Sequence, residues 1–266
     1  MPYCKSADVN IYYEIHGSGL PLMFLHGFTL DGRMWRDQVD YFKERYRVII
    51  CDARGHGRSE APETGYARED RAGDIHKLAD LLNLTKFHLI GLSMGGGDAV
   101  SFAIDQQERL LSLTLAATVV SGWMPSKRYH DFSREAKEKG CDAALRDYMQ
   151  ATLGYYDKRH PALKKRLHEI MSDFSGGPWL DPMKGKYPKR DDLALVSGLE
   201  IPILIMAGQH DIYFRPLAER LHHLIKNSRL EILKDVGHMV NLENPAEFNK
   251  ILETFLSAIE LPEINP

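Results

Sequence analysis

Cysteine is scarce in this 266-residue chain, which holds only three cysteines in an odd, scattered set. Cys4, Cys51 and Cys141 show no CxxC spacing, which is typical of free thiols in a reducing compartment rather than of a disulfide framework. The amino-terminal MPYCKSADVN also lacks the basic-then-apolar run of a signal peptide. We therefore expect a cytoplasmic protein.

Long hydrophobic runs and a strong charge bias are missing as well. No stretch approaches the roughly 18 consecutive apolar residues of a membrane span. The formal net charge is −3, so neither a membrane nor a nucleic acid is expected as a partner. The hydrophobic fraction of 44% and the charged fraction of 27% are those of an ordinary globular domain.

Motifs for metals and nucleotides are absent from the chain. There is no HxH, HExxH or CxxC spacing and no GxxxxGK[ST], and GLSMGGGDA at 91–99 does not match GxGxxG. His210 beside Asp211 is therefore not interpreted as a metal ligand. We expect no metal ion and no cofactor.

Short β-rich runs alternate with helical patterns along most of the chain. Several runs are apolar without alternation, as strands buried on both faces of a parallel sheet are. This order predicts an α/β fold with an open, doubly wound, mostly parallel sheet. We expect the first two runs to form a hairpin at the sheet edge, turning through residues 17–19. The runs are 9–15, 21–27, 46–53, 86–91, 110–117, 201–208 and 229–235.

Helical periodicity is clear in three segments between or after these runs. The last helix begins with Asn244 as its cap, Pro245 at its first position and Glu247 three residues after the cap. The apolar stripes that predict the helices are Trp35, Val39 and Phe42; Ile75, Leu78, Ala79 and Leu82; and Phe248, Ile251, Leu252 and Phe255.

Residues 120–197 break the alternation, because they show helical stripes and many aromatics but no convincing buried strand. The clearest of these stripes is Leu163, Leu167, Ile170, Met171 and Phe174. We expect a helical cap at 120–197 inserted into a core domain formed by 1–119 and 198–266, covering the carboxyl ends of the strands. Residues 126–190 carry 15 Lys and Arg against 9 Asp and Glu. Such an excess is usually a solvated face; the alternative is that one basic side chain receives a substrate carboxylate.

A serine stands between two glycines in GLSMG, where the strand-like KFHLI gives way to a helical pattern. This setting favours a nucleophile elbow, in which Ser93 lies on a strained turn and Gly91 and Gly95 permit close contacts. Met94 would open the helix and direct its backbone N–H toward the serine oxygen. The plainer interpretation is a tight turn with a solvated hydroxyl.

A serine nucleophile requires a base and a group that orients the base. His238 follows the last predicted strand and precedes the capped final helix, and Asp211 follows the strand that begins near Ile201. Taken singly, His238 would be an exposed loop histidine and Asp211 a turn residue. The order Ser, Asp, His, each after a separate strand, favours a catalytic triad.

Five motifs in this order resemble the α/β-hydrolase superfamily, in the branch with an inserted helical cap. They are LHGF (25–28), DARGHGRS (52–59), GLSMGG (91–96), AGQHD (207–211) and GHMVNLENP (237–245). The resemblance implies that Ser93 is the nucleophile, His238 the base and Asp211 the orienting acid. It also implies that Phe28 and Met94 supply the N–H groups of the oxyanion hole.

The other candidate residues are expected to line the substrate pocket or to have structural roles. We expect Trp123 and Met239 to line the substrate pocket. Asp98 is expected to be an acid on a helix surface. The loop residues are expected to shape turns rather than perform chemistry; they are His26, Gly27, Asp52, Arg54 and His56.

The resemblance implies a serine hydrolase that cleaves a carboxylic ester or lactone of a small, largely apolar substrate. A serine at 93 argues against epoxide hydrolases and dehalogenases, which use Asp there. C–C hydrolases of diketone-type ring-fission products often have Asn before the serine and Trp after the histidine, where this chain has Leu92 and Met239. That reaction, a cofactor-free perhydrolase and a non-enzymatic small-molecule receptor remain alternatives.

Overall fold

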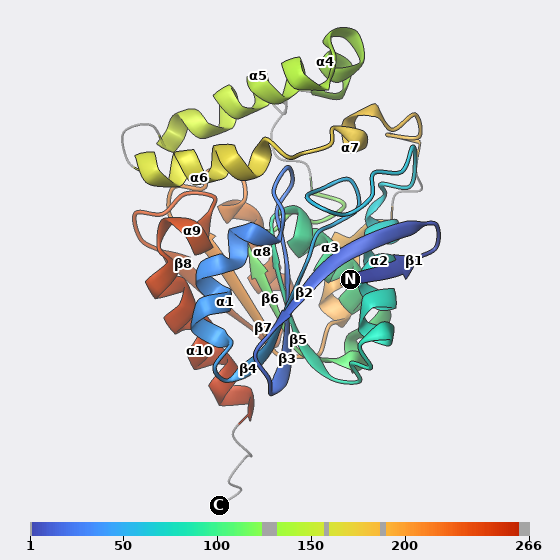
Figure 1. Cartoon of the computed structure of the whole chain (residues 1–266). Coiled ribbons are helices and arrows are strands. Elements are labelled where there is room, and N and C mark those ends of the chain that lie inside the picture. Colours follow the sequence, from blue (N-terminus) through green and yellow to red (C-terminus); the bar gives the residue numbers. More distant parts are fainter. Residues whose placement is uncertain (1, 124–131, 157–159, 187–189, 261–266) are drawn as a thin grey trace, which may run out of the picture.

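An eight-stranded sheet organises the molecule, in the order β1-β2-β4-β3-β5-β6-β7-β8 (Figure 1). The computed structural model describes residues 2–123, 132–156, 160–186 and 190–260. From β4 through β8 the neighbouring strands are parallel, while β1 and β2 pair antiparallel at one edge. The predicted doubly wound, mostly parallel α/β sheet is confirmed. The strands are β1 (Tyr3–Ser6), β2 (Val9–His16), β3 (Leu20–Leu25), β4 (Tyr46–Cys51), β5 (Phe87–Leu92), β6 (Leu110–Ala116), β7 (Ile203–Gly208) and β8 (Ser228–Leu233).

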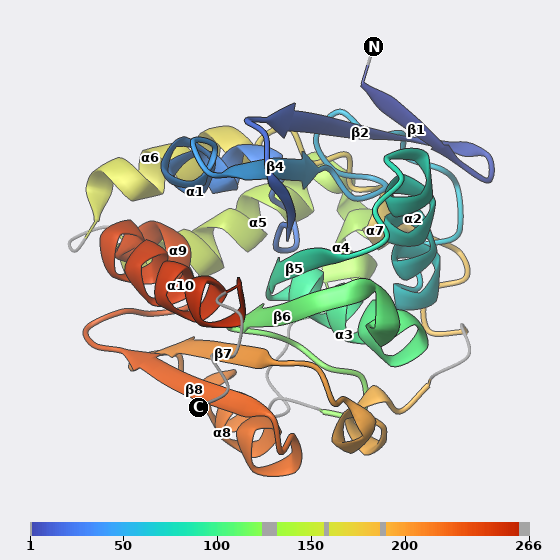
Figure 2. The same ribbon diagram turned by 90° about the horizontal axis from the view of Figure 1, so that it is seen from below.

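Helices cover both faces of this sheet. Seen from below, α1 and α10 lie on one face and α2, α3 and α8 on the other (Figure 2). The runs of β5 and β7 are buried at every position, as strands with helices on both sides must be. The helices are α1 (Arg36–Phe42), α2 (Arg68–Leu81), α3 (Met94–Gln106), α4 (Phe132–Lys139), α5 (Cys141–Leu153), α6 (Pro161–Met171), α7 (Gly177–Leu180), α8 (Arg215–Leu224), α9 (Val240–Glu243) and α10 (Pro245–Glu260).

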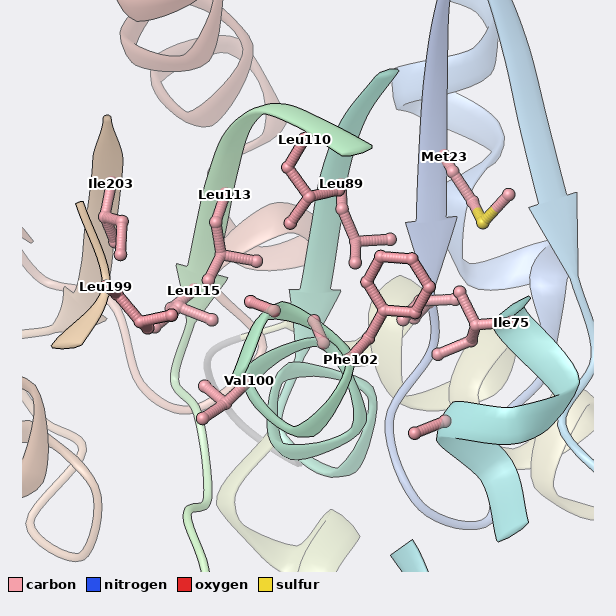
Figure 3. Packing of buried hydrophobic residues seen from close by; sticks show 14 of the residues in the cluster. Met23, Ile75, Leu89, Val100, Phe102, Leu110, Leu113, Leu115, Leu199 and Ile203 are labelled. Atoms are coloured by element: carbon pink, nitrogen blue, oxygen red, sulfur yellow. The ribbon is translucent and has the colours of Figure 1, made fainter. Parts of the chain in front are cut away.

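Two apolar layers result, one on each side of the sheet. In the layer of α2 and α3, Phe102 and Ile75 pack against strand residues such as Met23 and Leu89 (Figure 3). In the other layer, Trp35 and Phe42 pack with residues of α10. Most residues of the predicted helical stripes therefore lie on the buried faces of α1, α2 and α10, while Trp35 directly precedes α1 and Leu82 directly follows α2.

The predicted hairpin between the first two runs is wrong. β2 pairs antiparallel with β4, and its hairpin partner is the short strand β1. β3 instead lies between β4 and β5, parallel to both. The last four residues of β3, Leu22 to Leu25, are buried there, whereas β2 is partly exposed at most of its positions and belongs near the edge.

The described part of residues 120–197 contains helices α4 to α7 and no strand, and Figure 1 shows these helices together beyond one end of the sheet. The predicted stripe from Leu163 to Met171 lies on α6, while Phe174 follows the helix end. The division into a core domain and a cap remains a prediction.

The expected start of the last helix is confirmed. Asn244 Oδ1 accepts the backbone N–H of Glu247 at 3.2 Å, and Asn244 Nδ2 donates to Glu247 Oε2 at 2.6 Å. This exchange satisfies a donor that the first helical turn leaves open. It also fixes the point at which the chain leaves the loop after β8.

Candidate active site

Ser93 occupies a strained turn between β5 and α3. Its backbone has φ 54° and ψ −111°, in the region that a residue with a side chain rarely adopts. The strain is held in place by neighbouring main chain: Ser93 N–H donates to Ala116 C=O at 2.9 Å, and Ser93 C=O accepts from Gly97 and Val119. The sharp turn that the sequence predicts at this position is present.

The two flanking glycines are required by contact distance. A Cβ on Gly91 would lie 2.3 Å from the carbonyl oxygen of Gly95. A Cβ on Gly95 would lie 2.5 Å from the carbonyl oxygen of Leu25 and 2.6 Å from that of His26. Because real Cβ atoms do not approach this closely, glycine lets β3, β5 and α3 converge directly beneath Ser93.

His238 and Asp211 are joined by a hydrogen bond, since they follow the adjacent parallel strands β8 and β7. The distance from His238 Nδ1 to Asp211 Oδ2 is 2.7 Å. A carboxylate can only accept here, so Nδ1 carries the proton and Nε2 of the neutral ring is the basic nitrogen. The Phe214 ring packs on the imidazole with a centroid distance of 4.9 Å.

The environment keeps the Asp211 carboxyl ionised. Burial alone would raise its pKa, but the hydrogen bond from His238 and the positive charge of its protonated form lower the pKa below its usual value. The backbone N–H groups of Phe214 and Tyr213 also donate to Oδ1, at 3.0 and 3.2 Å. Asp211 therefore fixes the imidazole as a charged acceptor.

Ser93, His238 and Asp211 all line one cavity of about 540 Å³. Gly27 and Phe28, which follow β3, form part of the same wall. The four loops meet because the carboxyl ends of parallel strands lie at one edge of a sheet. The structure thus brings together the three residues of the predicted triad.

Two backbone N–H groups are available at this edge. Within the described residues, neither the Phe28 N–H nor the Met94 N–H donates to another residue. Met94 is also the first residue of α3, where the helix dipole adds positive potential. These two donors suit an oxygen that gains negative charge.

The ring of Phe28 lies in an aromatic cluster from the segment between β6 and β7. Its centroid is 6.1 Å from Tyr148 on α5, 5.3 Å from Phe174 and 5.9 Å from Trp179 on α7, each edge-on. Such pairs add about 0.5–1.5 kcal/mol each beyond area burial. The helical segment therefore holds the loop that presents the Phe28 amide.

The rest of the cavity wall is largely apolar and aromatic. Among the described residues it includes no lysine or arginine; Lys127, Arg128, Lys158 and Arg159 lie outside the described residues. Most of these wall residues show no sequence pattern that marks them as pocket residues. Ile212 and Tyr213 are the exception, because they directly follow Asp211 in the loop after β7. The other wall residues are Thr29, Leu30, Phe132, Tyr148, Ala151, Thr152, Leu153, Tyr156, Met171, His210, Phe214, Gly237 and Met239.

The two residues expected in the pocket differ in outcome. Met239 lines the cavity. Trp123 does not: its ring packs against the core on the α8 side and lies 5.9 Å from the guanidinium carbon of Arg220. The turn at 120–123, closed by Trp123 N–H to Val120 C=O at 3.1 Å, directs the ring there, so the assignment of Trp123 is corrected.

The DARGHGRS segment forms a buried turn. Asp52 accepts the backbone N–H groups of Gly32 and Arg58 at 2.8 and 2.9 Å, and Arg54 pairs with buried Asp74. His26 Nε2 accepts from Ala53 N–H at 2.8 Å, which joins this turn to the loop after β3. These contacts agree with the expected structural roles.

Asp98 is not on the surface, contrary to expectation. It is 3% exposed and forms two hydrogen bonds of 2.8 Å with Arg71 of α2. Because α2 packs along α3, the position that a single-helix pattern assigns to solvent is covered. A buried carboxylate then requires the paired arginine.

Two kinds of feature are absent from the parts of the chain that the structure describes. No group of three or more His, Cys, Asp or Glu side chains there could hold a metal ion. No helix in those ranges combines the length and apolar character needed to cross a bilayer.

Comparison with known proteins gives consistent matches over most of the chain. A family described as alpha/beta hydrolase fold matches residues 21–245. The 3-oxoadipate enol-lactonase 1 of Acinetobacter baylyi is 28% identical over 90% of this chain and 89% of its own. The structure of the enol-lactonase from Burkholderia xenovorans superposes with a TM-score of 0.85 at 25% identity, over 96% of this chain and 100% of the other. A thermophilic esterase from Thermogutta terrifontis gives the same score and identity over 97% and 98%.

Proposed function

The chain belongs to the alpha/beta hydrolase fold family, and from that premise we propose that it cleaves a carboxylic ester or lactone through an acyl-enzyme on Ser93. One observation carries the proposal: the strained Ser93 lines the same cavity as the hydrogen-bonded pair of His238 and Asp211. The similarity to proteins named enol-lactonase and esterase supports hydrolysis of an ester or lactone as the reaction type.

In the first half-reaction, Ser93 Oγ attacks the substrate carbonyl carbon while Nε2 of His238 accepts the hydroxyl proton. Asp211 holds the Nδ1 proton and stabilises the imidazolium that forms. The carbonyl oxygen becomes an oxyanion facing the N–H groups of Phe28 and Met94; a single such donor is typically worth about 3–4 kcal/mol. Collapse of the tetrahedral species breaks the C–O bond, and His238 returns its proton to the leaving oxygen.

In the second half-reaction, water attacks the acyl carbon and gives its proton to Nε2 of His238. The second tetrahedral species then expels Ser93 Oγ, which regains the proton from the same imidazole. A carboxylic acid leaves and the resting state returns. Every proton and electron pair in this cycle is accounted for by protein, substrate and water, so the proposal invokes no cofactor.

The cavity supports a small, largely apolar substrate. Its volume of about 540 Å³ suits a small organic molecule, and its described wall carries aromatic and aliphatic side chains without lysine or arginine. We expect a neutral ester to have a higher kcat/KM than a carboxylate-bearing ester of the same shape. A higher value for the anionic ester would instead favour a basic cap side chain as its partner.

The decisive experiment is a panel of short esters, lactones and vinylogous diketones assayed with the wild type and Ser93→Ala. We expect steady turnover of p-nitrophenyl acetate or butyrate by the wild type and its loss in the variant. Acylation of one equivalent of protein with no further turnover would indicate a receptor. Preferred cleavage of the diketones would indicate a C–C hydrolase, and peracid formation from acetate and peroxide a perhydrolase.

A further inference from the structure

The carboxylate of Glu243 holds both main-chain amides that flank His238. Glu243 is the last residue of α9, five positions after the histidine. Its Oε2 accepts the N–H of Gly237 at 2.8 Å, and its Oε1 accepts the N–H of Met239 at 3.0 Å. One side chain thus fixes the backbone immediately before and immediately after the imidazole.

Two hydrogen bonds to an ionised acceptor are stronger than bonds between neutral groups. The Asp211 contact fixes how the imidazole is rotated, because it acts on Nδ1. The Glu243 contacts act instead on the loop that carries the histidine Cα, and so determine how far Nε2 reaches into the cavity. Asp211 therefore fixes the rotation of the imidazole, and Glu243 fixes the position of the backbone that carries it.

A third bond links this arrangement to the helical segment. The hydroxyl of Tyr156 donates to Glu243 Oε1 at 3.0 Å. Tyr156 ends the short 3-10 helix Gly154–Tyr156 after α5, is 4% exposed and lines the cavity. The segment between β6 and β7 thereby contacts the support of the base as well as the Phe28 ring.

Capping of the last helix does not account for Glu243. That task belongs to Asn244 and Glu247, which exchange hydrogen bonds with each other. Glu243 makes its three side-chain bonds to the histidine loop and to Tyr156.

We infer that Glu243 is a positioning residue for the catalytic base His238, and that Tyr156 ties this support to the helices over the cavity. The inference rests on the proposed serine hydrolase mechanism. It predicts a loss in the rates of both half-reactions, because His238 moves a proton in each. A displacement of about 1 Å at a reacting group is enough to cost about 100-fold in rate.

The test measures how fast a fluorophosphonate labels Ser93, together with kcat and KM for p-nitrophenyl butyrate. For Glu243→Ala we expect labelling and kcat to fall about 10–100-fold, with KM changed by no more than about twofold. Glu243→Gln should lose less, since its amide oxygen still accepts one N–H. Tyr156→Phe, which keeps the ring in the cavity wall, should show the smallest loss.

Glu247→Gln is the matched control, because it neutralises a nearby carboxylate that contacts Asn244 and not the histidine loop. It should lower the melting temperature and leave the labelling rate unchanged. Wild-type labelling rates in folded Glu243→Gln and Tyr156→Phe, or a defect confined to KM, would overturn the inference. A wild type that labels at Ser93 but turns over no ester would refute the proposed function alone, and one that does not label would refute both.

Discussion

Acid should destabilise this protein through His88, the second residue of β5. Its side chain is 0% exposed, and Nδ1 lies 2.8 Å from Ser112 Oγ on β6. Burial lowers the pKa of His88 to about 4 from a usual value of 6.5. The carboxylate of Glu260, 3.5 Å from Nε2, does not offset this, because it is partly exposed and already accepts the hydroxyl of Tyr46.

The direction of the effect follows from which state binds the proton. Between pH 6.5 and 4 the unfolded chain is protonated at His88 while the folded protein is not, so the free energy of unfolding falls as pH falls through this window. Linkage with these two pKa values gives a loss of about 2 kcal/mol between pH 7 and pH 5 and about 3 kcal/mol by pH 4.

Urea unfolding of the wild type and His88→Asn at pH 7 and pH 5 measures this contribution. The asparagine amide can replace the hydrogen bond between Nδ1 and Ser112 Oγ but does not titrate. We expect the wild type to lose about 2 kcal/mol more than the variant over this interval. His223→Asn, at an exposed site on α8, should behave as the wild type. Equal losses in the wild type and His88→Asn would refute the reasoning.

Three further outcomes are expected. Asp211→Asn should keep the fold but lower kcat about 10³–10⁴-fold, because an amide no longer fixes the Nδ1 proton; a kcat within tenfold of the wild type would contradict this. Gly95→Ala should reduce soluble yield and melting temperature, since its Cβ meets the main chain of β3, whereas Gly73→Ala, with nothing within 4 Å, should raise stability by about 0.5–1 kcal/mol. Arg54→Met should cost about 3–5 kcal/mol in urea unfolding by leaving the buried Asp74 unpaired, and Asp74→Asn in the same background should recover part of that loss.

Local sequence patterns predicted much of this fold, because the spacing of apolar residues within one segment indicates which of its faces is buried. The apolar runs of β5 and β7 and the stripe of α2 all correspond to buried faces. The cap of α10 and the strained turn at Ser93 are likewise determined by a few neighbouring residues.

Features that depend on distant partners could not be predicted in this way. The position of β3 between β4 and β5 depends on pairings across the chain, and a local turn at 17–19 does not specify them. Burial of Asp98 depends on α2, and the direction of the Trp123 ring depends on α8. Glu243 lies inside the GHMVNLENP motif, but its hydrogen bonds to Gly237, Met239 and Tyr156 depend on the folded loop and on a distant helical segment.

The place where α4 to α7 enter the chain has an evolutionary consequence. These helices follow β6 and precede β7 in the chain. Insertions or deletions between those two strands therefore do not change the lengths of the loops that carry Phe28, Ser93, Asp211 and His238. Substitutions or length changes on these helices can therefore reshape the cavity and alter the range of molecules accepted without changing those loops. We expect substitutions to be tolerated least at side chains such as Trp179, which contact the loop that carries Phe28.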